Sequence, residues 1–218
     1  MIKSITSLWA ILGFVLSSYP VYAEDVKPGK IEVSKENIAA GKTKSEVCNG
    51  CHGVNGMSVD PKLIPNLAGQ YADYIYYQTR EFQEGHRHDD TMSAMSALVS
   101  SEDDLKDIAA YYSSLKMMTG TNPTSPLAKQ GKQLYLRGIP KIGLSSCVSC
   151  HGKNGKGNGT KSTFIPVIGG QQKMYLQEEL MDFKTGLRPN GPSGHMGDLS
   201  KKMSDVEIQA LAEYLSGL

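Results

Sequence analysis

Two short segments of the chain repeat one pattern, CNGCH at residues 48–52 and CVSCH at residues 147–151. Two thiols separated by two residues can both add to the vinyl groups of one porphyrin, and the histidine that follows is then held beneath the iron as its proximal ligand. This spacing is the attachment signature of c-type haem. It predicts two covalently bound haems c, each with its iron. The residues expected to bind them are Cys48, Cys51, His52, Cys147, Cys150 and His151.

Four cysteines also admit three other interpretations. In an exported protein they can form two disulfides, paired Cys-x-x-Cys elements can hold zinc, and a single element can act as a redox dithiol. None of these predicts a histidine after both pairs. Zinc ligands would also have to converge from motifs that lie 99 residues apart. Haem attachment explains both histidines and is therefore the preferred interpretation.

The similarity between the two halves extends well beyond the motifs, which indicates a tandem repeat. Residues 64–70 (IPNLAGQ) match residues 165–171 (IPVIGGQ), and residues 101–115 run parallel to residues 204–218 without a gap. The second copy differs by an insertion before its motif, because Gly131 precedes Cys147 by 16 residues whereas Gly41 precedes Cys48 by 7. Tyr74, Phe82, Gly85 and Arg87 recur as Tyr175, Phe183, Gly186 and Arg188.

The N-terminus resembles a secretory signal. Lys3 precedes an apolar stretch of 12 residues, which Ser17, Ser18 and Pro20 break before residues 21–23 (VYA). The stretch is shorter than the ~18 apolar residues of a spanning helix, so cleavage after Ala23 is favoured over retention as an anchor. The predicted organisation is a signal peptide (1–23), an N-terminal extension (24–35), a first domain (36–118), a linker rich in turn formers (119–125) and a second domain (126–218).

Helices joined by loops account for the patterns in both halves. Ser125 before Pro126 is typical of a helix start, and Ser101 and Ser204 have capping-box spacing to Asp104 and Glu207. Apolar residues recur at three-to-four spacing after these caps, and no stretch alternates convincingly with period two. The fold class is therefore all-α, with each small domain expected to fold around its haem.

A carrier that binds no substrate needs a second axial ligand on each iron, and methionine is the main candidate. Met92 and Met95 lie in the loop expected before the last helix of the first half, 40 and 43 residues after His52. Met196 stands 45 residues after His151, and Met203 lies just before Ser204. Met92 and Met196 are the preferred ligands, with Met95 as the alternative in the first half.

Several other residues have two open interpretations. His195 is either a rival ligand or a surface residue, and the surface role is preferred; His86 and His88 belong to a polar run and are expected to be solvated. Carbonyls of Pro65 and Pro166 can accept the ring N–H of the two proximal histidines, or these prolines simply turn a loop. Two roles are equally plausible for four further residues. They can contact haem propionates, or they can serve ordinary packing and solvation: Tyr74, Tyr175, Arg87 and Arg188.

Charge excludes nucleic acid as a partner. Without residues 1–23 the chain has 22 basic and 22 acidic residues, and the basic residues form no stripe along the sequence. This neutrality leaves the choice of protein partners open.

On these residues the chain resembles the cytochrome c4 family, diheme class I cytochromes c. The resemblance covers both halves and is carried by the two motifs, Pro65 and Pro166 with their flanking residues, Met92, Met95 and Met196. It implies two tandem class I cytochrome c domains with approximate twofold symmetry and histidine–methionine ligation. In similar proteins the first methionine of the first-half pair is the ligand, which favours Met92.

The resemblance also implies a function. The chain is expected to be a periplasmic electron carrier and not an enzyme, moving electrons between a quinol-oxidising complex and a terminal oxidase or other acceptor. Peripheral association with the membrane fits this role, and no small-molecule substrate is expected. Two alternatives remain, the cytochrome subunit of a dehydrogenase such as a sulfide-oxidising flavocytochrome, and a diheme peroxidase or thiosulfate-oxidising enzyme. The asymmetric insertion predicts two unequal haem potentials.

Overall fold

The computed structural model describes residues 30–60, 62, 64–99, 101–157, 164–189 and 194–218. The predicted signal peptide lies outside these residues. Within them the chain is helical, and its one pair of bridged extended residues is Ile139 with Leu144. No helix of this part combines the length and apolar character that crossing a membrane requires. The prediction of an all-α fold is confirmed.

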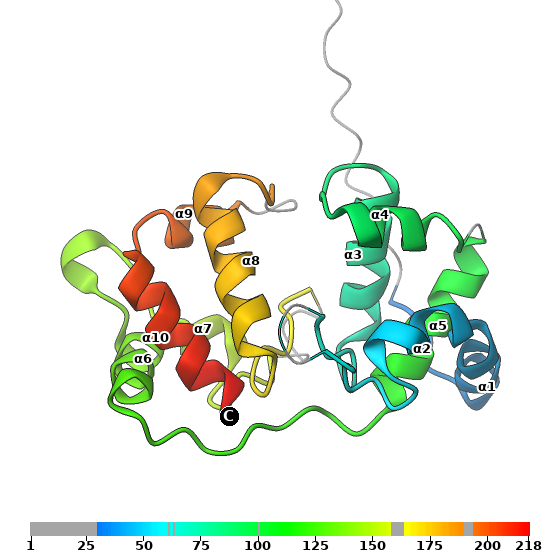
Figure 1. Cartoon of the computed structure of the whole chain (residues 1–218), viewed down its shortest axis with the longest axis horizontal. Coiled ribbons are helices and arrows are strands. Elements are labelled where there is room, and N and C mark those ends of the chain that lie inside the picture. Colours follow the sequence, from blue (N-terminus) through cyan, green and yellow to red (C-terminus); the bar gives the residue numbers. More distant parts are fainter. Residues whose placement is uncertain (1–29, 61, 63, 100, 158–163, 190–193) are drawn as a thin grey trace, which may run out of the picture.

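The helices form two similar groups that lie side by side, joined by a linker that runs along one edge (Figure 1). In each group the first and last helices cross each other, and the middle helices α3 and α8 lie toward the centre of the molecule. The first group is α1 (Lys35–Lys44), α2 (Glu46–His52), α3 (Ala72–Gln83), α4 (Asp90–Ser96) and α5 (Glu102–Ser114). The second is α6 (Pro126–Arg137), the 3₁₀ turn η1 (Pro140–Ile142), α7 (Val148–His151), α8 (Lys173–Thr185), α9 (His195–Ser200) and α10 (Asp205–Ser216).

Side-chain caps fix the starts of the long helices. Ser125 accepts the Ala128 N–H at 3.0 Å, with Pro126 at the first position of α6, as predicted. Before α10, Ser204 and Glu207 form a complete capping box. Before α5, Ser101 accepts the Asp104 N–H at 3.4 Å, but the Asp104 carboxylate pairs with Lys44 at 2.6 Å. Asp104, which is shorter than the usual capping-box glutamate, thus forms a contact between helices α5 and α1.

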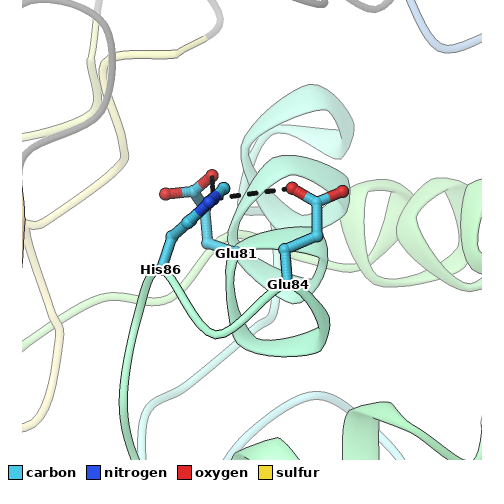
Figure 2. A group of neighbouring side chains, drawn as sticks. All are labelled: Glu81, Glu84 and His86. Atoms are coloured by element: carbon cyan, nitrogen blue, oxygen red, sulfur yellow. Dashed lines mark ion pairs between the residues drawn. The ribbon is translucent and has the colours of Figure 1, made fainter. Parts of the chain in front are cut away.

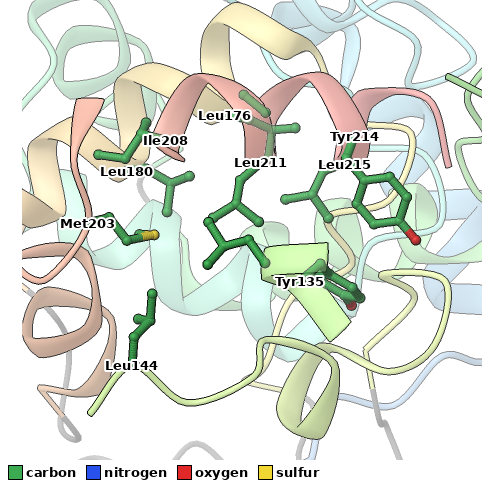
Figure 3. Close-up of a cluster of buried hydrophobic side chains, with 11 residues drawn as sticks. Tyr135, Leu144, Leu176, Leu180, Met203, Ile208, Leu211, Tyr214 and Leu215 are labelled. Atoms are coloured by element: carbon green, nitrogen blue, oxygen red, sulfur yellow. The ribbon is translucent and has the colours of Figure 1, made fainter. Parts of the chain in front are cut away.

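Each group of helices has its own apolar core. Figure 3 shows the second core, where side chains of α6, α8 and α10 meet Leu144, which follows η1. The predicted insertion therefore contributes Leu144, which is 2% exposed, to the second core. In the first core, helices α3 and α5 supply most of the buried side chains, namely Ala72, Ile75, Tyr76, Leu105, Ile108, Ala109, Tyr111 and Tyr112.

The linker is held against the end of the second half. Gly120 and Asn122 donate their backbone N–H groups to the carbonyls of Leu218 and Gly217, the latter at 2.7 Å. The connection is therefore attached to the two residues that follow α10 and does not hang free between the halves.

Close crossing of the terminal helices depends on one glycine in each half. A Cβ atom at Gly41 would lie 1.9 Å from the carbonyl oxygen of Asp107, and one at Gly131 would lie 1.9 Å from that of Ala210. Helix packing at this distance requires a residue without a side chain. A glycine that packs against a backbone carbonyl therefore occurs both where α1 crosses α5 and where α6 crosses α10.

We expect Gly41→Ala and Gly131→Ala each to destabilise the holoprotein by roughly 1–3 kcal/mol, because the helices must move apart. Chemical unfolding followed by far-ultraviolet circular dichroism measures the loss. Gly50→Ala is the matched control, since a Cβ there meets nothing within 4 Å and the second motif carries Ser149 at this position. Equal stability of Gly41→Ala and Gly50→Ala would contradict the steric argument.

Candidate functional site

One large cavity runs through both halves. Its volume is about 2490 Å³, well above the ~300–1,000 Å³ of an ordinary small-molecule site, and side chains from both groups of helices line it. Both predicted proximal histidines, His52 and His151, are on its wall. The cavity therefore has room for two large groups, one in each half.

In the first half, helix α2 carries the attachment motif to the cavity wall. Cys51 is exposed and Cys48 is half-buried, whereas His52 is buried at the end of the helix. The Nδ1 atom of His52 lies 2.9 Å from the carbonyl oxygen of Pro65. Because this contact engages Nδ1, it leaves Nε2 as the nitrogen available to an iron.

The second half repeats this arrangement on a shorter helix. Helix α7 ends at His151, which is buried, and its Nδ1 atom lies 3.2 Å from the carbonyl oxygen of Pro166. The contact considered for the two prolines is thus present in both halves. A carbonyl partner orients the ring and makes it a better ligand, as the outer partners of metal-bound histidines commonly do.

The pKa shifts fit metal ligation and oppose the redox-dithiol interpretation. Burial lowers the pKa of both histidines, partly offset by the proline carbonyls, so the neutral ligating form is favoured. Burial raises the pKa of Cys48 and of Cys147 to about 11. Reactive dithiols have lowered pKa values, so these thiols lack the character of a redox pair.

The candidate sixth ligands lie on short helices, where a loop was expected. Helix α4 carries Met92 and Met95, and both are half-buried and line the cavity. Helix α9 carries Met196, which is half-buried at the cavity, next to His195, which is exposed. Met203 also reaches the cavity but belongs to the second apolar core. The two preferred ligands, Met92 and Met196, and the alternative Met95 therefore all line the cavity.

The two histidines of the polar run after α3 are at the surface. His88 is exposed, and His86 is 51% exposed with its Nδ1 atom 3.5 Å from Glu81 and 3.6 Å from Glu84 (Figure 2). The expectation that both histidines are solvated agrees with this exposure. Neither position competes with the buried histidines for a haem iron.

Sequence reasoning did not find the contact between the two halves. Two glutamine side chains each bind the backbone of the opposite half. Gln70 accepts the N–H of Val167 at 2.9 Å and donates to its carbonyl at 2.8 Å, and Gln171 makes the same pair of bonds to Asn66 at 2.8 and 2.9 Å. The signal was the repeated glutamine at the end of the IPNLAGQ and IPVIGGQ segments.

The two arginines whose role was open lie in the same interface. Arg87 and Arg188 are both buried, and each stacks over a phenylalanine of its own half, Phe82 or Phe183, with 4.5 Å between the guanidinium carbon and the ring centre. Both pair with the carboxylate of Glu179. Solvation therefore does not explain them. They are part of a buried polar cluster that joins α3 and α8.

Comparison with known proteins agrees with this geometry. The sequence model of the cytochrome c family matches residues 38–116 and again residues 128–218. Cytochrome c4 of Pseudomonas aeruginosa is 37% identical over 84% of this chain and 89% of that protein. A crystal structure of reduced cytochrome c4 from Pseudomonas stutzeri superposes with a TM-score of 0.77 at 38% identity, covering 83% of this chain and 98% of that one. A thiosulfate dehydrogenase electron acceptor from Thiomonas intermedia is 33% identical over 82% of this chain and 81% of its length.

The chain therefore belongs to the cytochrome c family, with one cytochrome c domain in each half. It is an electron-transfer protein and not an enzyme. Within the family it is a diheme cytochrome of the c4 type, and it carries two covalently bound haems c.

Glu179 connects the stability of the interface to pH. Burial alone would raise the pKa of this carboxyl, but Arg188 and Arg87 outweigh burial and hold the pKa below its usual 4.5. A group whose pKa is lowered by folding contributes stability above its unfolded pKa and loses it as the pH falls. Glu178 and Asp182 act in the opposite direction, because burial and then nearby carboxylates raise their pKa values.

We expect the unfolding temperature of the holoprotein to fall as the pH is lowered from 4.5, and Glu179→Gln to flatten this dependence. Thermal unfolding between pH 7 and pH 3 measures it. Glu213→Gln is the control, because the Glu213 ion pair with Lys173 lies at the surface and is worth less. An unchanged pH slope in Glu179→Gln would show that the buried ion pairs do not govern acid stability.

Proposed function

We propose that this protein is a periplasmic electron carrier that moves electrons from a quinol-oxidising respiratory complex to a terminal oxidase or another acceptor. The observation that carries the proposal is the placement of two buried histidines, His52 and His151, on the wall of one cavity shared by both halves. Two redox groups in one continuous cavity allow an electron to enter at one half and leave from the other.

Each half supplies the residues that one haem requires. We assign covalent attachment to Cys48 and Cys51, and to Cys147 and Cys150 in the second half, on the basis of their spacing. His52 with Met92, and His151 with Met196, are the proposed axial ligand pairs. The haem iron supplies a one-electron couple. The half-buried Met92 and Met196 would supply the second protein ligand to each iron, at the position that a substrate would otherwise occupy.

Protein groups around each haem tune its one-electron couple. The carbonyls of Pro65 and Pro166 hold the histidine rings in place, which would limit the movement of these two side chains when an electron is gained or lost. A thioether ligand favours the reduced state relative to a second histidine. These features suit outer-sphere transfer between protein partners.

Localisation in the periplasm rests on the secretory signal expected at residues 1–23 and on the resemblance to exported cytochromes. Covalent haem attachment through four cysteines is compatible with that compartment.

The two halves differ in charge, which supports a carrier with two kinds of partner. Residues 36–118 contain seven basic and twelve acidic residues, whereas residues 119–218 contain twelve basic and seven acidic residues. The net charge of the whole chain is near zero because the charges of the two halves cancel. Opposite charges steer the two ends toward different protein surfaces.

A dehydrogenase is the second candidate donor. The Thiomonas intermedia relative, named a thiosulfate dehydrogenase electron acceptor, supports this alternative. Purification of the chain in a stable complex with a dehydrogenase would favour it over a quinol-oxidising donor. Binding of carbon monoxide to the native reduced protein would instead indicate an open iron and a peroxidase-type enzyme.

We expect Met92→Ala to remove the absorption band of methionine-ligated ferric haem from the first half, and Met196→Ala to remove it from the second, each with a lowered potential for that haem. Optical and magnetic spectra of the purified holoprotein measure ligation. Met95→Ala and Met203→Ala are the matched controls and should retain both bands.

Loss of the band in Met95→Ala, with retention in Met92→Ala, would reverse the assignment in the first half. Fewer than two irons per chain in the fully matured protein, or colour that acidified organic solvent extracts, would contradict covalent attachment in both halves.

A further inference from the structure

Four side chains form a closed polar ring between α3 and α8. Arg87 donates to Gln78 of its own half at 2.8 Å and to Glu179 of the other half. Arg188 donates to Glu179 of its own half and to Gln78 of the other half, at 2.7 Å. Each arginine therefore bridges the same two acceptors, one from each half of the molecule.

The ring follows the internal twofold relation of the repeat. Arg87 corresponds to Arg188, and Gln78 corresponds to Glu179. The surrounding contacts obey the same relation, because Arg87 donates to Tyr175 at 3.0 Å and Arg188 donates to Tyr74 at 2.9 Å. Within the ring itself, the charge differs between the halves only where Gln78 is replaced by Glu179. Next to this position, Tyr77 is likewise replaced by the exposed Glu178.

The position at which the two halves differ is shielded from water, so one charge there has a strong effect. The ring side chains of Arg87, Arg188 and Glu179 are between 8% and 14% exposed. Charges shielded from water act over longer distances than surface charges, because less solvent screens them. With two guanidinium groups and one carboxylate, the ring has a formal charge of +1.

The lone carboxylate also belongs to one side of the interface. Glu179 is on α8, whose Leu176 and Leu180 pack in the second apolar core with Met196. Its counterpart Gln78 is on α3, which packs on the first core. Both side chains line the shared cavity. The one negative charge of the ring is therefore on a helix of the second half, whereas the corresponding position on the helix of the first half is the uncharged Gln78.

We propose that Glu179 makes the two haem sites electrostatically unequal, lowering the reduction potential of the second haem by more than it lowers that of the first. A nearby negative charge opposes the gain of an electron, and its effect increases as the distance falls. Glu179 thus acts on the two potentials through its charge and is not itself a ligand. This inference rests on the proposed haem ligation in both halves.

A charge swap tests the inference without changing the composition of the ring. In the double variant Gln78→Glu/Glu179→Gln, the carboxylate moves to the α3 side while both arginines keep one anionic partner. We expect the potential of the second haem to rise, that of the first to fall, and the unfolding temperature to stay near that of the unmodified protein. Spectroelectrochemical titration, with the haems assigned by nuclear magnetic resonance, measures both potentials in the holoprotein.

Two further variants complete the test. Gln78→Glu alone makes the ring neutral and symmetric, so it should lower the potential of the first haem more than that of the second, even if the double variant does not fold. Glu178→Gln removes the exposed carboxylate next to Glu179 and should shift both potentials little. Equal shifts of both haems in the double variant, or none, would overturn the inference. Failure of the proposed ligation would appear separately, as altered spectra in the unmodified protein.

Discussion

A hydrogen bond between a buried histidine and a proline carbonyl organises each half of this cytochrome. The bond between His52 and Pro65 engages Nδ1 and so directs Nε2 to the cavity, and the bond between His151 and Pro166 does the same. The proline loops are themselves fixed, because the carbonyls of Gly56 and Gly155 accept N–H groups from residues just after each proline. The ring orientation that the iron needs is therefore set by the backbone.

The same loops also join the two domains. Asn66 directly follows Pro65 and forms backbone bonds with Gln171, while Val167 follows Pro166 and forms them with Gln70. One segment of about seven residues thus contacts the buried histidine of its own half and a glutamine side chain of the other half. Displacement of one domain would move the proline carbonyl of the other, so the interface and the orientation of His52 and His151 depend on each other.

The sequence was sufficient for features that depend on local spacing. The attachment motifs and the caps at Ser125 and Ser204 follow from such spacing. The sequence alone does not separate Met92 from Met95, because residues three apart lie on the same face of α4. It also did not reveal the partners of Gln70 and Arg87, since these lie about 90 to 100 residues away and are adjacent only after the two domains dock.

A duplicated unit gives both haems the same surroundings, so any difference between them must come from positions where the copies differ. The charge separation between the halves is mostly on surface residues, and salt screens such charges beyond about 8 Å at physiological ionic strength. It therefore acts mainly on docking. Glu179 is only 14% exposed, so solvent screens its charge less than it screens the charges at the surface. We infer that charge differences at the surface act on docking, whereas Glu179 in the interior acts on the potentials.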